Sequence, residues 1–126
     1  MKRLHVLERV KTRKEQIGLT LDNISKLSHL GNRTVTRFFS GEDVKLSTLE
    51  KITDIMGLDF AGNETVDIET LRDTRAKEKA IYIVSLVQDT SALEMQGLES
   101  EAIQSLIQDT KEQFLTGEYQ KNLWAS

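Results

Sequence analysis

Residues 19–58 of the 126-residue chain read LTLDNISKLSHLGNRTVTRFFSGEDVKLSTLEKITDIMGL, and the fold prediction rests mainly on this segment. Its apolar residues recur at helical spacing, and glycines or short polar connections interrupt the pattern. Thr20 can cap a helix because its hydroxyl can accept a hydrogen bond from a backbone amide of the first turn. The stretch therefore predicts three short helices, over residues 21–27, 32–39 and 46–56.

The sequence on either side extends this pattern. Within residues 2–17, Leu7, Val10 and Ile17 lie near one stripe among charged residues, which predicts a further amphipathic helix. Residues 61–67 are short of large apolar side chains and are the best candidate for a linker. The predicted domains are therefore a helical unit over residues 1–60, a linker over 61–67 and a second helical region over 68–126.

Two longer helices are predicted after the linker, over residues 68–95 and 99–115. The first contains the apolar run AIYIVSLV at residues 80–87, whose β-branched residues would also suit a strand. We favour a helix because neither flank of the run carries a turn signal. The predicted fold class is all-α, with an N-terminal bundle of four to five helices followed by a C-terminal helical dimerisation segment.

The composition excludes several classes of protein. With 38% hydrophobic and 29% charged residues, the chain is expected to be globular. No apolar run approaches the ~20 residues of a membrane span, and the absence of cysteine excludes thiolate metal sites and suits a cytoplasmic protein. His5 and His29 have no partners at ligand spacing, and no catalytic or nucleotide-binding motif is present. We therefore expect no metal, no cofactor and no enzymatic activity.

Charge is distributed unevenly along the chain. Residues 1–45 carry ten Lys and Arg against five Asp and Glu, whereas residues 46–126 carry seven against fifteen. On a chain of net charge −3, a basic N-terminal part favours a local anion-binding face. A chance excess on a solvated surface explains the same counts, so charge alone leaves both interpretations open.

The N-terminal residues also stand in a familiar order. Gly-Leu-Thr precedes the second predicted helix, and the small residues Ser25 and Ser28 stand where two helices pack tightly. The remaining residues of the pattern are Ile24, Leu30, Thr34, Val35, Gly41, Leu46, Thr48, Leu49, Glu50, Lys51, Ile52, Gly57 and Leu58. In this order the chain resembles the Cro/repressor-type (XRE-like) helix-turn-helix family of DNA-binding proteins, over about residues 7–60.

The resemblance implies that residues 32–39 form a recognition helix, whose N-terminal end enters the DNA major groove. Asn32, Arg33 and Arg37 are expected to read bases, since Asn pairs with adenine and Arg with guanine through two hydrogen bonds. The residues expected to contact the DNA backbone are Lys14, Thr20, Thr34, Thr36 and Lys45, with Arg13 beside Lys14 as a further candidate.

Two positions depart from the family pattern. Leu21 stands where the family commonly has a glutamine that bonds a phosphate, and a leucine side chain cannot make this bond. Gly31 stands where the recognition helix usually has a Ser or Thr cap, and glycine caps a helix without a side chain. Both departures reduce the expected set of DNA contacts without contradicting the fold.

The function predicted from these features is transcriptional regulation. The chain is expected to be a repressor that binds a palindromic operator in double-stranded DNA as a homodimer. The run at residues 80–87 is too apolar for one amphipathic helix to cover, so Tyr82, Val84, Leu86 and the tail residue Trp124 are expected at a dimer interface. The alternative is an antitoxin-like autoregulator, whose acidic C-terminal half binds and neutralises a partner protein.

Overall fold

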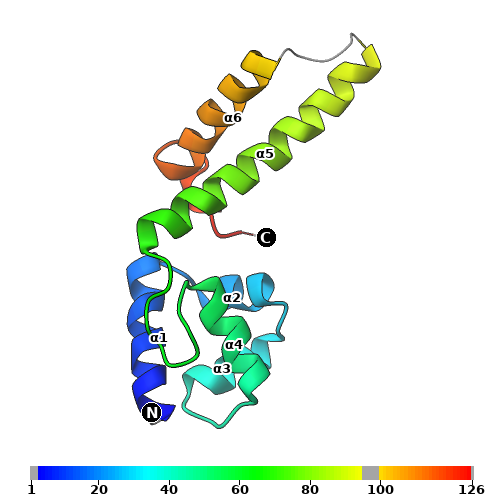
Figure 1. Cartoon of the computed structure of the whole chain (residues 1–126). Coiled ribbons are helices and arrows are strands. Elements are labelled where there is room, and N and C mark those ends of the chain that lie inside the picture. Colours follow the sequence, from blue (N-terminus) through cyan, green and yellow to red (C-terminus); the bar gives the residue numbers. More distant parts are fainter. Residues whose placement is uncertain (1–2, 95–99, 126) are drawn as a thin grey trace. The chain divides into compact units, whose positions relative to one another are not determined.

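A computed structural model describes residues 3–94 and 100–125 of the protein, and helices make up most of this part (Figure 1). The helices are α1 (Arg3–Ile17), α2 (Leu21–Ser28), α3 (Asn32–Phe39), α4 (Leu46–Ile55), α5 (Ile68–Glu94), α6 (Ser100–Leu115) and the short 3₁₀ helix η1 (Gln120–Asn122). The described residues contain no strand, and a single isolated bridge pairs Leu58 with Glu64. The predicted all-α class is confirmed.

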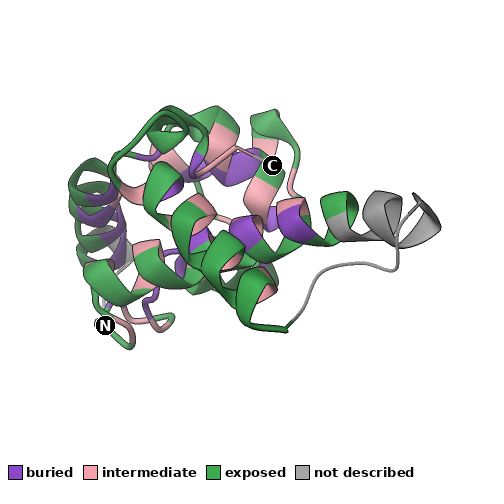
Figure 2. Ribbon diagram, turned by 90° about the horizontal axis from the view of Figure 1, so that it is seen from above, coloured by how far each residue is buried: buried purple, intermediate pink, exposed green. Residues whose placement is uncertain are grey.

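The chain divides into two compact units, one of residues 1–71 with 124–126, and one of residues 72–123. We call them the N-terminal unit and the helical-pair unit. The core of the N-terminal unit draws side chains from all four of its short helices, and Figure 2 shows these buried positions in purple. The fully buried core residues are Val10, Ile24, Val35, Ile52 and Met56.

The turn between α2 and α3 is short and closely packed. His29 adopts the left-handed conformation, with φ of 59°, which reverses the chain at the end of α2. The Ser25 hydroxyl donates to the carbonyl of Leu30 at 2.5 Å, and the buried Ser28 hydroxyl donates to the carbonyl of Ile24 at 2.5 Å. These bonds satisfy polar groups inside the turn, which explains why small hydroxyl side chains stand there.

The segment after α4 folds back onto α1. Arg13 is 4% exposed and donates from Nε to the carbonyl of Met56 at 2.9 Å. Its guanidinium also donates to Glu64 at 2.6 Å and to the carbonyl of Val66. The expectation that Arg13 reaches a DNA phosphate is therefore wrong, because its donors are used inside the unit. Most of residues 61–67, the predicted linker, belong to this ordered segment.

The helical-pair unit is built from α5, α6 and η1. Ala76, Ala80 and Val84 recur every four residues on α5 and form its buried side, and Figure 1 shows α5 and α6 lying side by side. An ion pair of 2.7 Å between Lys111 and Asp73 joins the two helices. The run at residues 80–87 is helical throughout, as predicted.

Two cations of α5 hold the end of η1 in the same unit. Arg75 donates from Nε to the carbonyl of Leu123 at 3.0 Å, and Lys79 donates to the carbonyl of Asn122 at 2.7 Å. Burial lowers the pKa of both side chains because it disfavours their charged forms.

None of the helices in residues 3–94 and 100–125 is long and apolar enough to cross a membrane.

Candidate nucleic-acid interface

Helix α3 presents a polar face opposite its buried one. Val35 and Phe38 are 0% and 4% exposed and anchor the helix in the N-terminal core. On the opposite side, Arg33 and Arg37 stand four residues apart, so both side chains leave the same exposed face. Asn32, also exposed, lies in the first turn of the helix. The structure therefore places Arg33 and Arg37 on one exposed face and Asn32 at the exposed start of the same helix.

These side chains are available for contact. Among the described residues, Asn32, Arg33 and Arg37 form no side-chain hydrogen bond and no ion pair with another side chain. Arginine carries five N–H donors, and each unpaired guanidinium can donate two parallel bonds to a guanine edge or a phosphate. The surface formed by Asn32, Arg33 and Arg37, which we call the α3 face, can therefore bind a polyanion that exposes acceptor groups.

The start of α3 adds backbone donors to this face. Its N-cap is Gly31, which makes no side-chain capping bond. The first amides of a helix have no intrahelical acceptor, and the helix dipole favours negative charge at this end. The predicted phosphate-contacting residue Thr36 is exposed on α3, whereas Thr34 is half-buried on its flank.

The remaining predicted backbone contacts come from the neighbouring helices. Thr20 caps α2, and its hydroxyl oxygen accepts a hydrogen bond from the amide of Asn23 at 3.0 Å, which leaves the hydroxyl proton to donate. Lys45 is the exposed N-cap of α4. Lys14 lies in the last turn of α1 and approaches Glu15 at 3.6 Å. All three residues are on the N-terminal unit, which also carries the α3 face.

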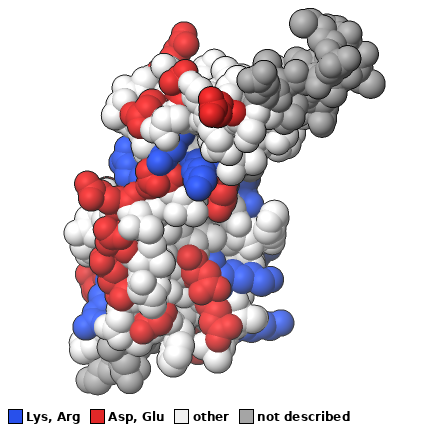
Figure 3. Space-filling view, turned by 45° about the horizontal axis from the view of Figure 1, so that its top comes forward, with Lys and Arg blue, Asp and Glu red and all other residues white. Residues whose placement is uncertain are grey.

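The charge that would attract DNA is local. Acidic side chains spread over much of the face drawn in Figure 3, and the net charge of the chain is −3. Helix α3, however, contains two arginines and no acidic residue, and the single acid of α2, Asp22, is paired with Lys26 at 3.1 Å. Contact with DNA would therefore depend on α3 and its surroundings, because the molecule as a whole repels a polyanion.

The predicted dimer residues have different environments. Tyr82 and Leu86 are 66% and 52% exposed on α5. Val84 is 4% exposed and belongs to the buried side of the same helix. Trp124 is partly buried and packs against the core of the N-terminal unit. Of the four residues, Tyr82 and Leu86 are thus the ones that present large side chains to solvent.

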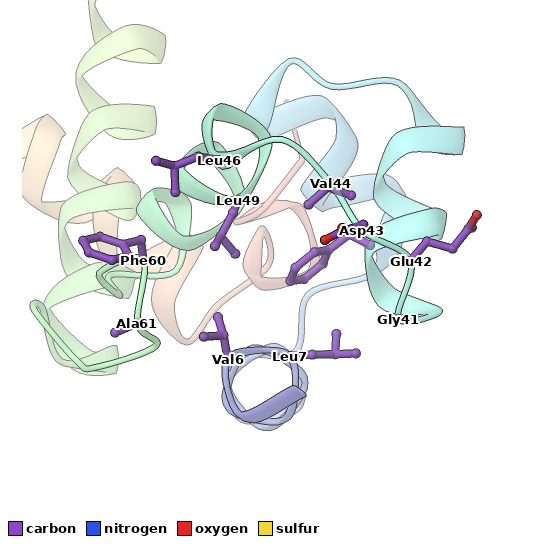
Figure 4. A pocket seen from close by; sticks show the side chains of 11 residues that line it. Val6, Leu7, Gly41, Glu42, Asp43, Val44, Leu46, Leu49, Phe60 and Ala61 are labelled. Atoms are coloured by element: carbon purple, nitrogen blue, oxygen red, sulfur yellow. The ribbon is translucent and has the colours of Figure 1, made fainter. Parts of the chain in front are cut away.

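Sequence reasoning missed two features of the N-terminal unit. One is the structural role of Arg13, whose partners lie far along the chain and leave no local signal. The other is an apolar pocket whose rim includes Phe60 (Figure 4), a residue that the sequence places next to a linker.

The described residues contain no group of three or more His, Asp or Glu arranged to hold a metal ion.

A short helix, a tight turn and a second helix with an exposed polar face define a helix-turn-helix arrangement. A comparison with curated proteins finds similarity over part of the chain. Over 50 residues the chain is 36% identical to a protein of Archaeoglobus fulgidus described as "Putative HTH-type transcriptional regulatory protein". The match covers 40% of this chain but 16% of that relative. No protein-family model and no solved structure matches the chain.

Proposed function

We propose that the protein is a sequence-specific DNA-binding regulator of transcription, and that α3 is its recognition helix. The observation that carries the proposal is the α3 face: two arginines and an asparagine lie exposed, without a side-chain partner among the described residues, on a helix whose Val35 and Phe38 are buried. Side chains of this length and chemistry suit base edges in the major groove. The partial similarity to a regulator of the helix-turn-helix type supports the same function.

We further propose that the protein is a repressor that binds a palindromic operator as a homodimer. Two recognition helices related by a twofold axis match two half-sites about one helical turn apart. The dimer contact would be made by Tyr82 and Leu86, whose apolar surfaces are unfavourable in water. Val84 would support this contact from behind, within the buried side of α5.

The test of DNA recognition starts from selection of genomic DNA fragments by the full-length protein. Affinity for a selected fragment is then measured for Arg33→Ala and for a control, Lys77→Ala, which removes an equal charge from an exposed position on α5. Arg33→Ala should cost about 1–3 kcal/mol of discrimination at one base position, and the control should cost none. Unchanged specific affinity in Arg33→Ala would show that α3 is not the recognition helix.

A second candidate is an antitoxin-like regulator, and the exposed apolar residues of α5 are what favours it. The residues that would contact a second copy could equally contact a different protein. Purification of the protein from its own cells distinguishes the two. A stoichiometric second polypeptide, lost on Tyr82→Glu, would support the antitoxin-like function, whereas homodimers alone would support the repressor.

A further inference from the structure

The chain passes between its two units twice. It leaves the N-terminal unit after Leu71, within α5, forms the helical-pair unit with residues 72–123, and returns to the N-terminal unit at Trp124. The second passage is made by residues 122–125, which we call the strap. Compact units of one chain have cores of their own, so a segment that belongs to both can link their stabilities.

The first half of the strap is held by the helical-pair unit. Leu123 is 1% exposed, and its carbonyl accepts a hydrogen bond from Arg75 Nε at 3.0 Å. The carbonyl of Asn122 accepts a hydrogen bond from the ammonium of Lys79 at 2.7 Å. Both donors lie on α5, and charged donors make stronger hydrogen bonds than neutral ones. Two consecutive carbonyls and one buried side chain therefore attach this half of the strap to α5.

The second half of the strap belongs to the N-terminal unit. Trp124 is partly buried and packs against the core of this unit, as do Ile68 and Leu71 from the start of α5. Ala125 is also partly buried. An indole ring carries a large apolar surface, and its removal from water favours the docked position. Two adjacent residues, Leu123 and Trp124, are thus anchored in different units.

The turn before the strap is also held in a defined conformation. The backbone carbonyl of Gln113 accepts a hydrogen bond from the amide of Tyr119, and its side-chain oxygen accepts one from the amide of Glu118, both at 3.0 Å. The helical-pair unit thus fixes the chain up to Leu123. Trp124 therefore loses less conformational freedom on docking than the same residue on a free tail would lose. Loss of the bonds to α5 should weaken its docking.

We propose that the strap couples the two units: the helical-pair unit holds it where Trp124 can dock, and the docked indole completes the core of the N-terminal unit. When the bonds from Arg75 and Lys79 are lost, Trp124 leaves this core, and the N-terminal unit stays folded but opens more often. A change in the helical-pair unit, such as the binding of a partner to α5, thereby reaches the unit that carries the α3 face. Its effect on DNA rests on the proposed function, whereas the coupling itself does not.

Fluorescence tests the docking, because the chain has one tryptophan and its emission reports on the strap. The strap variant is full-length protein with Arg75→Met and Lys79→Met. Its emission should shift to the red and its quenching by acrylamide should rise, because Trp124 becomes exposed. The control, Arg72→Met with Lys77→Met, removes the same two charges from α5 but no hydrogen bond to the strap, and should leave both signals unchanged. Unchanged emission in the strap variant would overturn the proposal.

Hydrogen exchange tests whether the effect reaches the N-terminal unit. The amides of Val35 and Ile52, whose side chains are fully buried in its core, are followed by NMR. The strap variant should raise their exchange rates about tenfold, because two hydrogen bonds that favour docking are lost in the other unit. Trp124→Ala should raise them as well, and adding the strap substitutions to it should have no further effect. Effects that simply add would show that the strap does not couple the units.

Two further arrangements keep this proposal falsifiable and distinct from the proposed function. If circular dichroism shows that the strap variant has lost helix content, Lys79→Met alone replaces it, with a smaller change expected in the same direction. Trp124→Ala should also bind a selected DNA fragment more weakly. If it changes core exchange but not DNA affinity, the coupling stands and its effect on DNA is wrong. If the protein selects no DNA, the proposed function fails, while fluorescence and exchange still test the strap.

Discussion

Burial gives two arginines of the N-terminal unit different roles. Arg13 is 4% exposed, and its guanidinium donates to groups of the same unit, including the carbonyl of Met56 and the carboxylate of Glu64. Arg33 is exposed and, among the described residues, makes no side-chain hydrogen bond or ion pair. The first therefore contributes to stability, and the second is available for recognition.

Replacement of Arg13 by methionine should destabilise the N-terminal unit. The carbonyls of Met56 and Val66 lose their side-chain donor, whereas Glu64, with a side chain 54% exposed, stays solvated. We expect a loss of about 2–3 kcal/mol in the free energy of unfolding, measured by urea denaturation. A change below about 0.5 kcal/mol would contradict the structural role assigned to this arginine.

Arg9→Met is the matched control for Arg13→Met. Arg9 is also on α1 but is exposed, and its guanidinium donates to Asn63 at 2.6 Å near the surface. Because water replaces an exposed hydrogen bond, this substitution should cost less than about 1 kcal/mol. A similar cost for both variants would mean that burial does not separate the two arginines.

Lys45→Ala tests a different kind of contact. The residue is an exposed N-cap without a side-chain capping bond, so its removal should leave α4 intact. If its ammonium binds a phosphate, the variant should bind all DNA sequences more weakly by about the same factor. The slope of log affinity against log salt concentration should fall by roughly one. The measurement is affinity over a range of salt concentrations, and a loss restricted to one sequence would instead assign Lys45 to base recognition.

At the scale of the elements, local patterns predicted the helices well. Helix α3 spans Asn32–Phe39, as the sequence predicted, and residues 80–87 are helical rather than extended. Both features were predicted from residues close together in the sequence. The bounds of α3 followed from the helical spacing of its apolar residues, and the helix over residues 80–87 followed from the absence of turn signals on either side. The segment that follows α4 was less predictable, because its conformation depends on hydrogen bonds to residues of α1, which are far away in the sequence.

Gly18 and Gly57, which follow the ends of α1 and α4, give a test that separates local conformation from contacts between segments far apart in the sequence. Gly18 and Gly57 have φ of 86° and 68°, which disfavours any side chain. A Cβ at Gly18 would meet nothing within 4 Å, whereas one at Gly57 would lie 2.8 Å from the carbonyl oxygen of Val66. Gly18→Ala should therefore lower the free energy of unfolding by about 1 kcal/mol, because only the left-handed backbone conformation disfavours the new side chain.

Gly57→Ala should cost about 1–3 kcal/mol more than Gly18→Ala, because backbone of the following segment must move. Thermal and urea unfolding of both variants give the comparison. Equal costs would show that the segment after α4 yields freely, contrary to the close approach of Val66 to this glycine.

For the whole molecule, the proposed dimer makes the clearest prediction. Tyr82→Glu with Leu86→Glu places two charges on the exposed apolar residues of α5, and a desolvated charge is costly at an interface. Sedimentation should show a dimer for the natural chain and a monomer for this variant, with weaker binding to a palindromic DNA fragment.

The control for the dimer variant is Gln104→Glu with Ser105→Glu, which adds the same charge at exposed positions of α6. It should remain dimeric, and circular dichroism should show unchanged helix content in both variants. A natural chain that is monomeric at micromolar concentration would contradict the dimer and leave Tyr82 and Leu86 to a different partner.

Local sequence patterns were sufficient to predict the all-helical class, the positions of the helices and the place of Asn32, Arg33 and Arg37 on one of them, because helical periodicity is a local property. Which candidate residues are accessible depends instead on how the helices pack against one another. Arg13 meets Met56 across 43 positions, and the pocket combines residues from α1, α4 and the segment after it. Burial depends on contacts between segments distant in sequence, and no local pattern records which segments those are.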